Sequence, residues 1–260
     1  MNEPPYDRDD LAAPPLDGPA FIKLLHQQRR EKYPAPPEFY QALFAGTVKR
    51  EHLELWVKNL YYYWDYGLRF STGAIIAKNN DEASRKKMIR KHVRIEGKNV
   101  VNDLNPEWTA PAYEELWLRF GEGLGLAREE ITSFRMYTRS YFAVSTLCLL
   151  ARYWEWSWLD GVANLYAADV LGRDCMPRVY EALKRQYGVA EEHLQFFPVL
   201  LEDVEESIPW EEEVLDYWAF TTERQLTAAR AFRNRLDVEH QLLLPLHHVA
   251  AGEREPFHVP

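Results

Sequence analysis

The feature that most constrains this chain is helical periodicity, which dominates it from end to end. Apolar residues recur every three or four positions over long stretches, and the alternation typical of strands is nearly absent. The two longest periodic stretches are 49–79 and 137–158, and the second is so apolar that we expect it at the centre of the molecule. The pattern predicts an all-α protein, a bundle of about eight to ten helices with short connections.

The organisation along the chain indicates one domain. The 260 residues include only 12 Gly, and no Gly-rich or Ser-rich linker divides them. Residues 1–18 carry four prolines and several aspartates without an apolar segment, so we expect a disordered arm rather than a secretory signal. Residues 19–244 form the predicted helical domain. Prolines and a glycine in 245–260 predict an irregular tail.

Composition argues against several classes of function. The net charge is -9, and the basic clusters 85–87 and 90–91 are interpreted as solvated helix faces, so no nucleic-acid partner is expected. The longest apolar run, 142–151, is too short to span a bilayer, so no membrane role is expected. With only Cys148 and Cys175, a structural disulfide is not expected and a cytoplasmic location fits best.

Three segments resemble a known family. Residues 56–63 read Trp-Val-Lys-Asn-Leu-Tyr-Tyr-Tyr, residues 115–126 contain a Leu-Trp pair and end in Gly-Leu-Gly-Leu, and Tyr187-Gly188 is followed by Phe196-Phe197. Together they resemble the PqqC/TenA branch of the haem-oxygenase-like helical fold, over about residues 35–235. The resemblance implies a haem-oxygenase-like multi-helix bundle, a homodimer, and one of three chemistries: metal-free oxidation with dioxygen, thiamine cleavage by a cysteine, or di-iron oxygenation.

A di-iron site of this family needs about six inward-facing carboxylates and imidazoles. Only Glu96 and Asp169 match the family's ligand positions. The other four positions hold residues that ligate iron poorly or not at all: Tyr113, Leu200, Val204 and Ser207. A di-iron oxygenase is therefore a less favoured reading, and no metal is expected. Glu96 and Asp169 have two equally favoured interpretations. They are either hydrogen-bonded acids with a structural role or acids that act in the pocket.

A thiaminase of this family needs a cysteine nucleophile on the helix after the long central one. The corresponding region, 165–170, contains no cysteine, and Asn59 stands where the family has an aspartate before its tyrosine pair. Thiaminase activity is therefore also disfavoured.

The remaining reading is the metal-free oxidase. The family's pocket histidine falls at about Ile95, with His92 one helical turn earlier, and the late-helix Tyr and Arg fall at Phe196 and Leu200. The family's tyrosine run is present at 61–63, and Asp169 stands where the family has a glutamate. Too few cations remain for a substrate with several carboxylates, so pyrroloquinoline quinone itself is not the expected product. Aromatic walls with a few polar groups suit a planar, mostly apolar ligand.

We therefore expect a PqqC-like, metal-independent oxidase or related biosynthetic enzyme that acts on a small aromatic or heterocyclic compound. No cofactor is expected, and dioxygen is the candidate co-substrate. A tyrosine or histidine would move protons and a carboxylate would orient the substrate. The alternative is a ligand-binding or accessory protein that kept the pocket and lost the chemistry. Catalytic roles are assigned to Tyr62, Tyr63, His92, Glu96 and Asp169, and substrate-binding roles to Tyr61, Trp64, Tyr113, Arg152, Glu155, Phe196 and Leu200.

Overall fold

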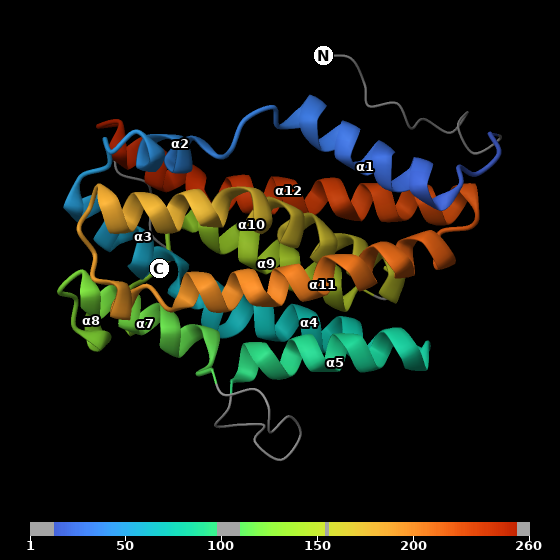
Figure 1. The fold of residues 1–260 in the computed structure, drawn as a ribbon, viewed down its shortest axis with the longest axis horizontal. Coiled ribbons are helices and arrows are strands. Elements are labelled where there is room, and N and C mark those ends of the chain that lie inside the picture. The colour runs from blue at the N-terminus through green and yellow to red at the C-terminus, as the bar shows by residue number, and fades with distance from the viewer. Residues whose placement is uncertain (1–12, 98–109, 154–155, 254–260) are drawn as a thin grey trace.

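The computed structural model describes residues 13–97, 110–153 and 156–253. The described residues form a helical bundle and contain no β-strand (Figure 1). The helices are α1 (Gly18–Lys32), α2 (Glu38–Phe44), α3 (Arg50–Tyr62), η2 (Tyr63–Gly67), α4 (Leu68–Lys78), α5 (Glu82–Glu96), α7 (Tyr113–Gly123), α8 (Arg128–Thr132), α9 (Thr138–Arg152), α10 (Trp158–Arg185), η3 (Glu191–His193), α11 (Phe196–Trp218) and α12 (Thr222–Ala250). The all-α fold class that the periodicity predicts is confirmed for the described residues.

The bundle is organised around α10 and α12. Helix α10 packs against both α11 and α12, and α9 and α1 also pack against α12. Figure 1 shows these helices along the long axis of the molecule, with α4 and α5 on the side opposite α1. Two clusters of buried apolar side chains fill the interior, and both draw residues from α10 and α12. No helix in the described part of the chain is both long enough and apolar enough to cross a membrane.

Local sequence signals set several helix starts. Asp17 accepts a hydrogen bond from the Ala20 N–H at 2.8 Å at the start of α1. Ser157 and Asp160 form a capping box at the start of α10. The described part of the predicted N-terminal arm, residues 13–17, is held to α12 by two hydrogen bonds. The Leu16 N–H donates to the Gln225 side-chain oxygen, and the Gln225 side-chain nitrogen donates to the Leu16 carbonyl.

Proline was a misleading stop signal in the late helices. The sequence predicted a helix end near Pro209 and an irregular tail from Pro245, but α11 and α12 continue through these residues. Each proline removes one backbone hydrogen bond, and the buried residues on both sides of it keep the helix packed against its neighbours. The predicted tail is therefore helical as far as Ala250. The predicted loop at 105–111 lies almost wholly outside the described residues.

The long predicted helix 49–79 is interrupted by a π-helical turn, η2. The Leu68 N–H bonds the Tyr63 carbonyl, five residues back, which is the π pattern. A Cβ on Gly67 would lie 2.7 Å from Val144 Cγ1, so the missing side chain lets α9 approach closely here. The wider turn changes the angular spacing of the side chains and carries Tyr63 and Trp64 at its start.

Candidate active site

A closed cavity of about 70 Å³ lies at the centre of the bundle. It is bounded by side chains from α2, α3, η2, α4, α5, α7, α10, α11 and α12. An engineered cavity of ~150 Å³ holds benzene, so this cavity in its closed form suits only a molecule of a few atoms. A ring-sized ligand requires its walls to move apart.

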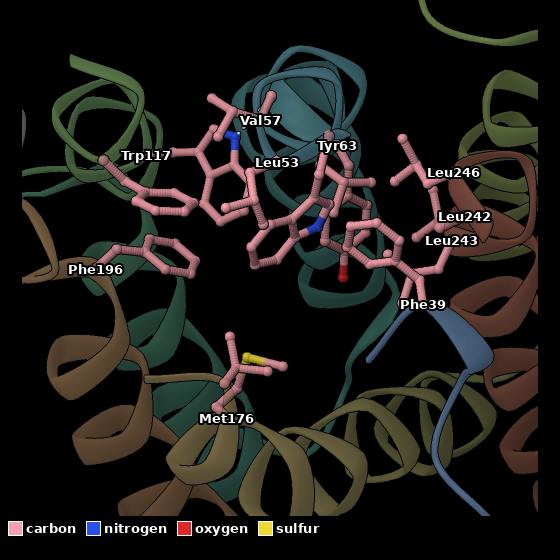
Figure 2. Packing of buried hydrophobic residues seen from close by; sticks show 14 of the residues in the cluster. Phe39, Leu53, Val57, Tyr63, Trp117, Met176, Phe196, Leu242, Leu243 and Leu246 are labelled. Atoms are coloured by element: carbon pink, nitrogen blue, oxygen red, sulfur yellow. Dashed lines mark hydrogen bonds between the residues drawn. The ribbon is translucent and has the colours of Figure 1, made fainter. Parts of the chain in front are cut away.

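One wall of the cavity is aromatic. Tyr63 and Trp64 from η2 and Tyr113 from α7 line it, and Phe196 of α11 packs behind them. The ring centroids of Trp64 and Phe196 are 4.7 Å apart, and those of Trp64 and Tyr113 are 6.3 Å apart, both in edge-to-face geometry. Figure 2 shows Phe196 beside Trp117, whose indole N–H bonds the Val57 carbonyl at 2.9 Å. This packing fixes the orientation of the wall.

The opposite side of the cavity is polar and is organised by Lys91 of α5. The Lys91 ammonium donates to Asp169 Oδ2 at 2.7 Å, Asp203 Oδ2 at 3.0 Å and Ser207 Oγ at 2.9 Å. Burial alone would lower the pKa of Lys91, but attraction to Asp169 and Asp203 outweighs it and raises the pKa above its usual value. Lys91 is therefore a permanent cation with all three protons in use.

Asp203 is the most heavily bonded acid of this group. Besides Lys91, it accepts the Tyr113 hydroxyl at 2.9 Å and Arg94 Nη1 at 3.4 Å. We call Lys91, Arg94, Asp169, Asp203 and Glu211 the sealed cluster, because each is at most 7% exposed. Burial, reinforced by Asp203, raises the pKa of Tyr113 well above its usual value, so its hydroxyl stays protonated and acts as a donor.

A second buried cation, Arg235 of α12, also lines the cavity. It is 0% exposed, forms an ion pair with Glu239 at 2.7 Å and donates to the Tyr63 hydroxyl oxygen. Tyr63 in turn donates to Glu239 at 3.1 Å. Burial is the largest influence on Tyr63 and raises its pKa, although Arg235 opposes this. Tyr63 is thus a neutral phenol, unsuited to act as a base near neutral pH.

The structure brings together five of the residues predicted from the sequence. Tyr63, Trp64, Tyr113, Asp169 and Leu200 all line the cavity. Phe196 lies directly behind it. These placements bring Asp169 to the polar side of the cavity, whereas Glu96, the other acid at a ligand position of the family, does not line it.

The other predicted residues do not line this cavity. His92 and Glu96 belong to what we call the outer cluster, on α4, α5 and α7: Arg69, Thr72, His92, Glu96 and Glu114. Lys91 and Ile95 are the α5 residues that line the cavity, and each next residue is turned by about 100° around the helix. His92 and Glu96 therefore point away from it.

Tyr61 and Tyr62 are likewise turned away from the cavity. Tyr62 stacks on Tyr66 and Tyr141, with ring centroids 5.1 and 6.2 Å away, on the partly exposed side of the bundle. Arg152 is exposed at the end of α9 and does not line the cavity. Glu155 lies outside the described residues.

The sequence does not identify four charged residues of the cavity wall: Lys91, Asp203, Arg235 and Glu239. Lys91 was interpreted as part of a solvated basic face, which the structure shows to be wrong. A signal was available, because Lys91 precedes the expected pocket position Ile95 by one helical turn. Asp203 directly precedes Val204, a position that the family resemblance had already placed at the pocket.

The residues present do not fit a di-iron centre. Asp169 and Asp203 are already bridged by the Lys91 ammonium, which supplies the positive charge between them. Leu200 and Val204 line the cavity where imidazole or carboxylate ligands would be needed. Within the described ranges, no three His, Cys, Asp or Glu side chains converge in a metal-holding geometry.

A surface depression of about 310 Å³ lies between α5 and α11. Lys91 and Asp203 line both this depression and the closed cavity. The ion pair between them is therefore part of the wall that separates the cavity from the surface. Lys87, Arg90 and Arg94 give the depression a partly basic rim.

Comparison with solved structures shows that this helical bundle has the haem-oxygenase-like fold. Solved structures of this shape include a heme oxygenase-like domain from Shewanella denitrificans, with a TM-score of 0.69, 12% identity and coverage of 94% of this chain and 99% of that one. A TenA homologue from Pyrococcus furiosus has a TM-score of 0.64, 19% identity and coverage of 88% and 99%. At these identities the likeness concerns the fold.

The chain belongs to the TENA/THI-4/PQQC family, whose model matches residues 27–173. It is similar to the pyrroloquinoline-quinone synthase of Klebsiella pneumoniae, with 23% identity over 225 residues, 85% of this chain and 83% of that protein. The similarity to the synthase of Ectopseudomonas mendocina is 30% over 122 residues. That match spans 45% of this chain and only 44% of the relative.

Proposed function

We propose that the chain is a PqqC-like oxidase that acts on a small aromatic or heterocyclic compound, with dioxygen as co-substrate and without a metal. One observation carries the proposal: the closed cavity joins an aromatic wall to a buried carboxylate, Asp169, and two buried cations, Lys91 and Arg235. Membership of a family whose similar relatives are named pyrroloquinoline-quinone synthases supports oxidation as the reaction class.

Each side of the cavity suits a different part of such a substrate. The rings of Trp64 and Tyr113 offer contact to a planar ligand, and the Arg235 guanidinium offers a donor to a carbonyl or carboxylate oxygen. Asp169 is the candidate base. Burial raises its pKa, Lys91 opposes this and Asp203 reinforces it, so the carboxylate accepts a proton more readily than a solvated one.

Metal independence is supported by the chemistry of the sealed cluster. A protein ammonium rather than a metal ion neutralises Asp169 and Asp203, at 2.7 and 3.0 Å. The substrate would be oxidised by direct reaction with dioxygen after Asp169 removes a proton. The substrate's own conjugated ring system would supply two electrons. Dioxygen would take them up with two protons, the one held by Asp169 and a second one lost by the substrate, to give hydrogen peroxide and return Asp169 to its ionised form.

The non-catalytic alternative rests on a different observation. At the late-helix positions where the family resemblance implies Tyr and Arg, Phe196 and Leu200 contribute only apolar surface. A binding protein would keep the aromatic wall and need no base. Native mass spectrometry of the purified protein would identify a co-purified compound, and turnover of that compound separates the two functions.

The test of the enzyme proposal is dioxygen consumption with that compound and with a panel of small aromatic and heterocyclic acids and ketones. We expect Asp169→Asn to lower kcat by at least ~100-fold, because a neutral amide cannot accept the proton. Asp174→Asn, on the same helix but 41% exposed, is the matched control and should retain the wild-type rate. Near-stoichiometric iron that is required for turnover would contradict metal independence, and equal rates in both variants would contradict the role of Asp169.

A further inference from the structure

Glu211 of α11 is a fully buried acid for which the proposed reaction has so far given no role. It is 0% exposed, and neither carboxyl oxygen accepts a hydrogen bond from a donor in the described residues. It follows Ser207 by one helical turn and Asp203 by two, so it lies on the helix face that meets Lys91. Lys91, Asp169 and Asp203 are the charged groups that act on it.

Lys91, the cation that acts on Glu211, already uses all of its protons in other hydrogen bonds. Lys91 directs its three protons to Asp169, Asp203 and Ser207, and none to Glu211. An ionised carboxylate with no donor and no cation of its own is very unfavourable in a protein interior. A neutral carboxylic acid avoids that cost, but its O–H group then requires an acceptor. Among the neighbouring acids, the Asp169 carboxylate is the one within hydrogen-bond reach of Glu211.

We propose that Glu211 is a neutral carboxylic acid that donates a hydrogen bond to Asp169, and that it positions and charge-balances Asp169 as the base of the cavity. The first part stands on the geometry of the sealed cluster, and the second rests on the proposed function. Burial, and then repulsion by Asp169, raise the pKa of Glu211 well above its usual value, which agrees with the assignment. The proton belongs to Glu211 because Lys91 directly contacts Asp169 and stabilises its ionised form.

The neutral state of Glu211 sets the charge of the whole sealed cluster. Lys91 and Arg94 balance Asp169 and Asp203, so the cluster is neutral before reaction. Arg94 also pairs with Glu206, which is 53% exposed and screened by water. When Asp169 takes a proton from a ligand, the bonding electron pair stays on the ligand and the cluster becomes positive. That charge holds the new ligand anion, whereas an ionised Glu211 would cancel it.

Other titratable groups around Glu211 come from neighbouring helices. Tyr166 of α10 is close enough for Glu211 to contribute to its raised pKa, after burial and its bond to Glu212. Tyr166 also bonds His26 of α1 at 2.9 Å. Tyr113 of α7 acts through Asp203. None of these groups supplies a cation to Glu211.

Infrared spectroscopy of the ligand-free protein at pH 7 tests the protonation directly. We expect a carboxylic-acid carbonyl band that shifts in D2O and in protein labelled with ¹³C-glutamate. Glu211→Gln should abolish the band, and Glu205→Gln, an exposed site on the same helix, should retain it. The absence of such a band, or a shift with ¹³C-aspartate instead of ¹³C-glutamate, would overturn the assignment. The labelled wild-type protein suffices if Glu211→Gln does not fold.

The pH dependence of unfolding provides a second test. Glu211 holds a proton in the folded protein that it releases on unfolding above the ordinary glutamate pKa, so wild-type stability falls as pH rises. Glu211→Gln lacks this proton. The unfolding equilibrium of the wild type should therefore rise about tenfold per pH unit relative to the variant, from about pH 5 to the folded-state pKa. A difference between Glu211→Gln and the wild type that stays constant over this pH range would overturn the proposal.

The functional half of the proposal has its own readout. Glu211→Gln keeps a neutral donor for Asp169, so dioxygen consumption should persist, whereas Glu211→Leu should lose most of kcat with KM little changed. Equal kcat in the two variants would contradict the positioning role. If the infrared band is present but no substrate is ever turned over, the neutral Glu211 stands and only the proposed oxidase fails.

Discussion

Helix α5 carries two groups of charged side chains that differ mainly in their access to water. Lys91 enters the sealed cluster, and its neighbour His92 enters the outer cluster. Both clusters join one helix to carboxylates on others. In the sealed cluster the Lys91 and Asp203 side chains are 5% and 2% exposed, whereas Arg69, the centre of the outer cluster, is 33% exposed.

The comparison shows why similar ion pairs have unequal consequences. Water screens the outer pairs, so losing one leaves groups that can be solvated. The sealed carboxylates cannot be solvated, so their pairing is close to obligatory. The same seclusion raises the pKa of Asp169 and makes it a candidate base. We therefore expect catalysis in the sealed cluster, where breaking an ion pair costs the most free energy.

The largest expected effect comes from removing the sealed cation. Lys91→Ala leaves Asp169 and Asp203 buried without their shared ammonium, and we expect a loss of about 3–5 kcal/mol in the free energy of unfolding. Chemical denaturation at pH 7 measures it. Lys87→Ala, one turn earlier and 38% exposed, removes only the ion pair with Glu213 and should cost less than about 1 kcal/mol. Comparable losses in the two variants would show that burial does not make the ion pairs of Lys91 harder to replace than an exposed pair.

A smaller effect is expected from the centre of the outer cluster. Arg69 contacts Glu96 at 2.9 Å and Glu114 at 3.1 Å. Arg69→Ala should lower the free energy of unfolding by about 1 kcal/mol, because water reaches both acids once the guanidinium is gone. Arg50→Ala, which breaks the exposed pair with Glu54 on α3, should cost about 0.3–0.5 kcal/mol. A loss for Arg69→Ala as large as that for Lys91→Ala would show that the outer cluster is effectively sealed too.

The sequence is sufficient to predict the helices and much of the aromatic wall of the cavity. Long apolar periodicity identified the bundle, and the segment 56–63 led to Tyr63. Helix continuity through Pro209 and Pro245 was not predictable from local signals, because tertiary packing on both sides outweighs the loss of one hydrogen bond. The π-turn at 63–67 gave no signal either, since it depends on the close approach of α9 to Gly67.

The polar side of the cavity was harder to predict for a geometric reason. On a helix, one residue of register error turns a side chain by about 100°. The sequence predicts His92 and Glu96 as site residues, whereas Lys91 and Ile95 are the α5 residues that line the cavity. Residue type alone points the wrong way here, because a histidine suggests a functional site and a lysine in a basic segment suggests a solvent-exposed side chain. Only the three-dimensional neighbours, Asp169 and Asp203, show that Lys91 is buried.

The smallest effect concerns the protonation of His92 in the outer cluster. Burial is the main cause of its lowered pKa; Glu96 opposes the shift and Arg69 adds to it. The unfolded chain therefore binds this proton more readily, and stability should fall as pH decreases through about 6.5, the ordinary histidine pKa, towards the folded-state value. His92→Gln should reduce this acid sensitivity, measured as Tm between pH 5 and 7.

Arg69→Ala tests the same electrostatics from the other side. Without the guanidinium, Glu96 stabilises the imidazolium unopposed, so the pKa of His92 should rise and the acid sensitivity should shrink without any change to the histidine itself. An NMR titration of the His92 ring in the two proteins measures the shift directly. A lower His92 pKa in Arg69→Ala would mean that the arginine acts on His92 by shaping its packing rather than through its charge. The outer cluster would then depend on packing, as the sealed cluster does, although water reaches it more easily.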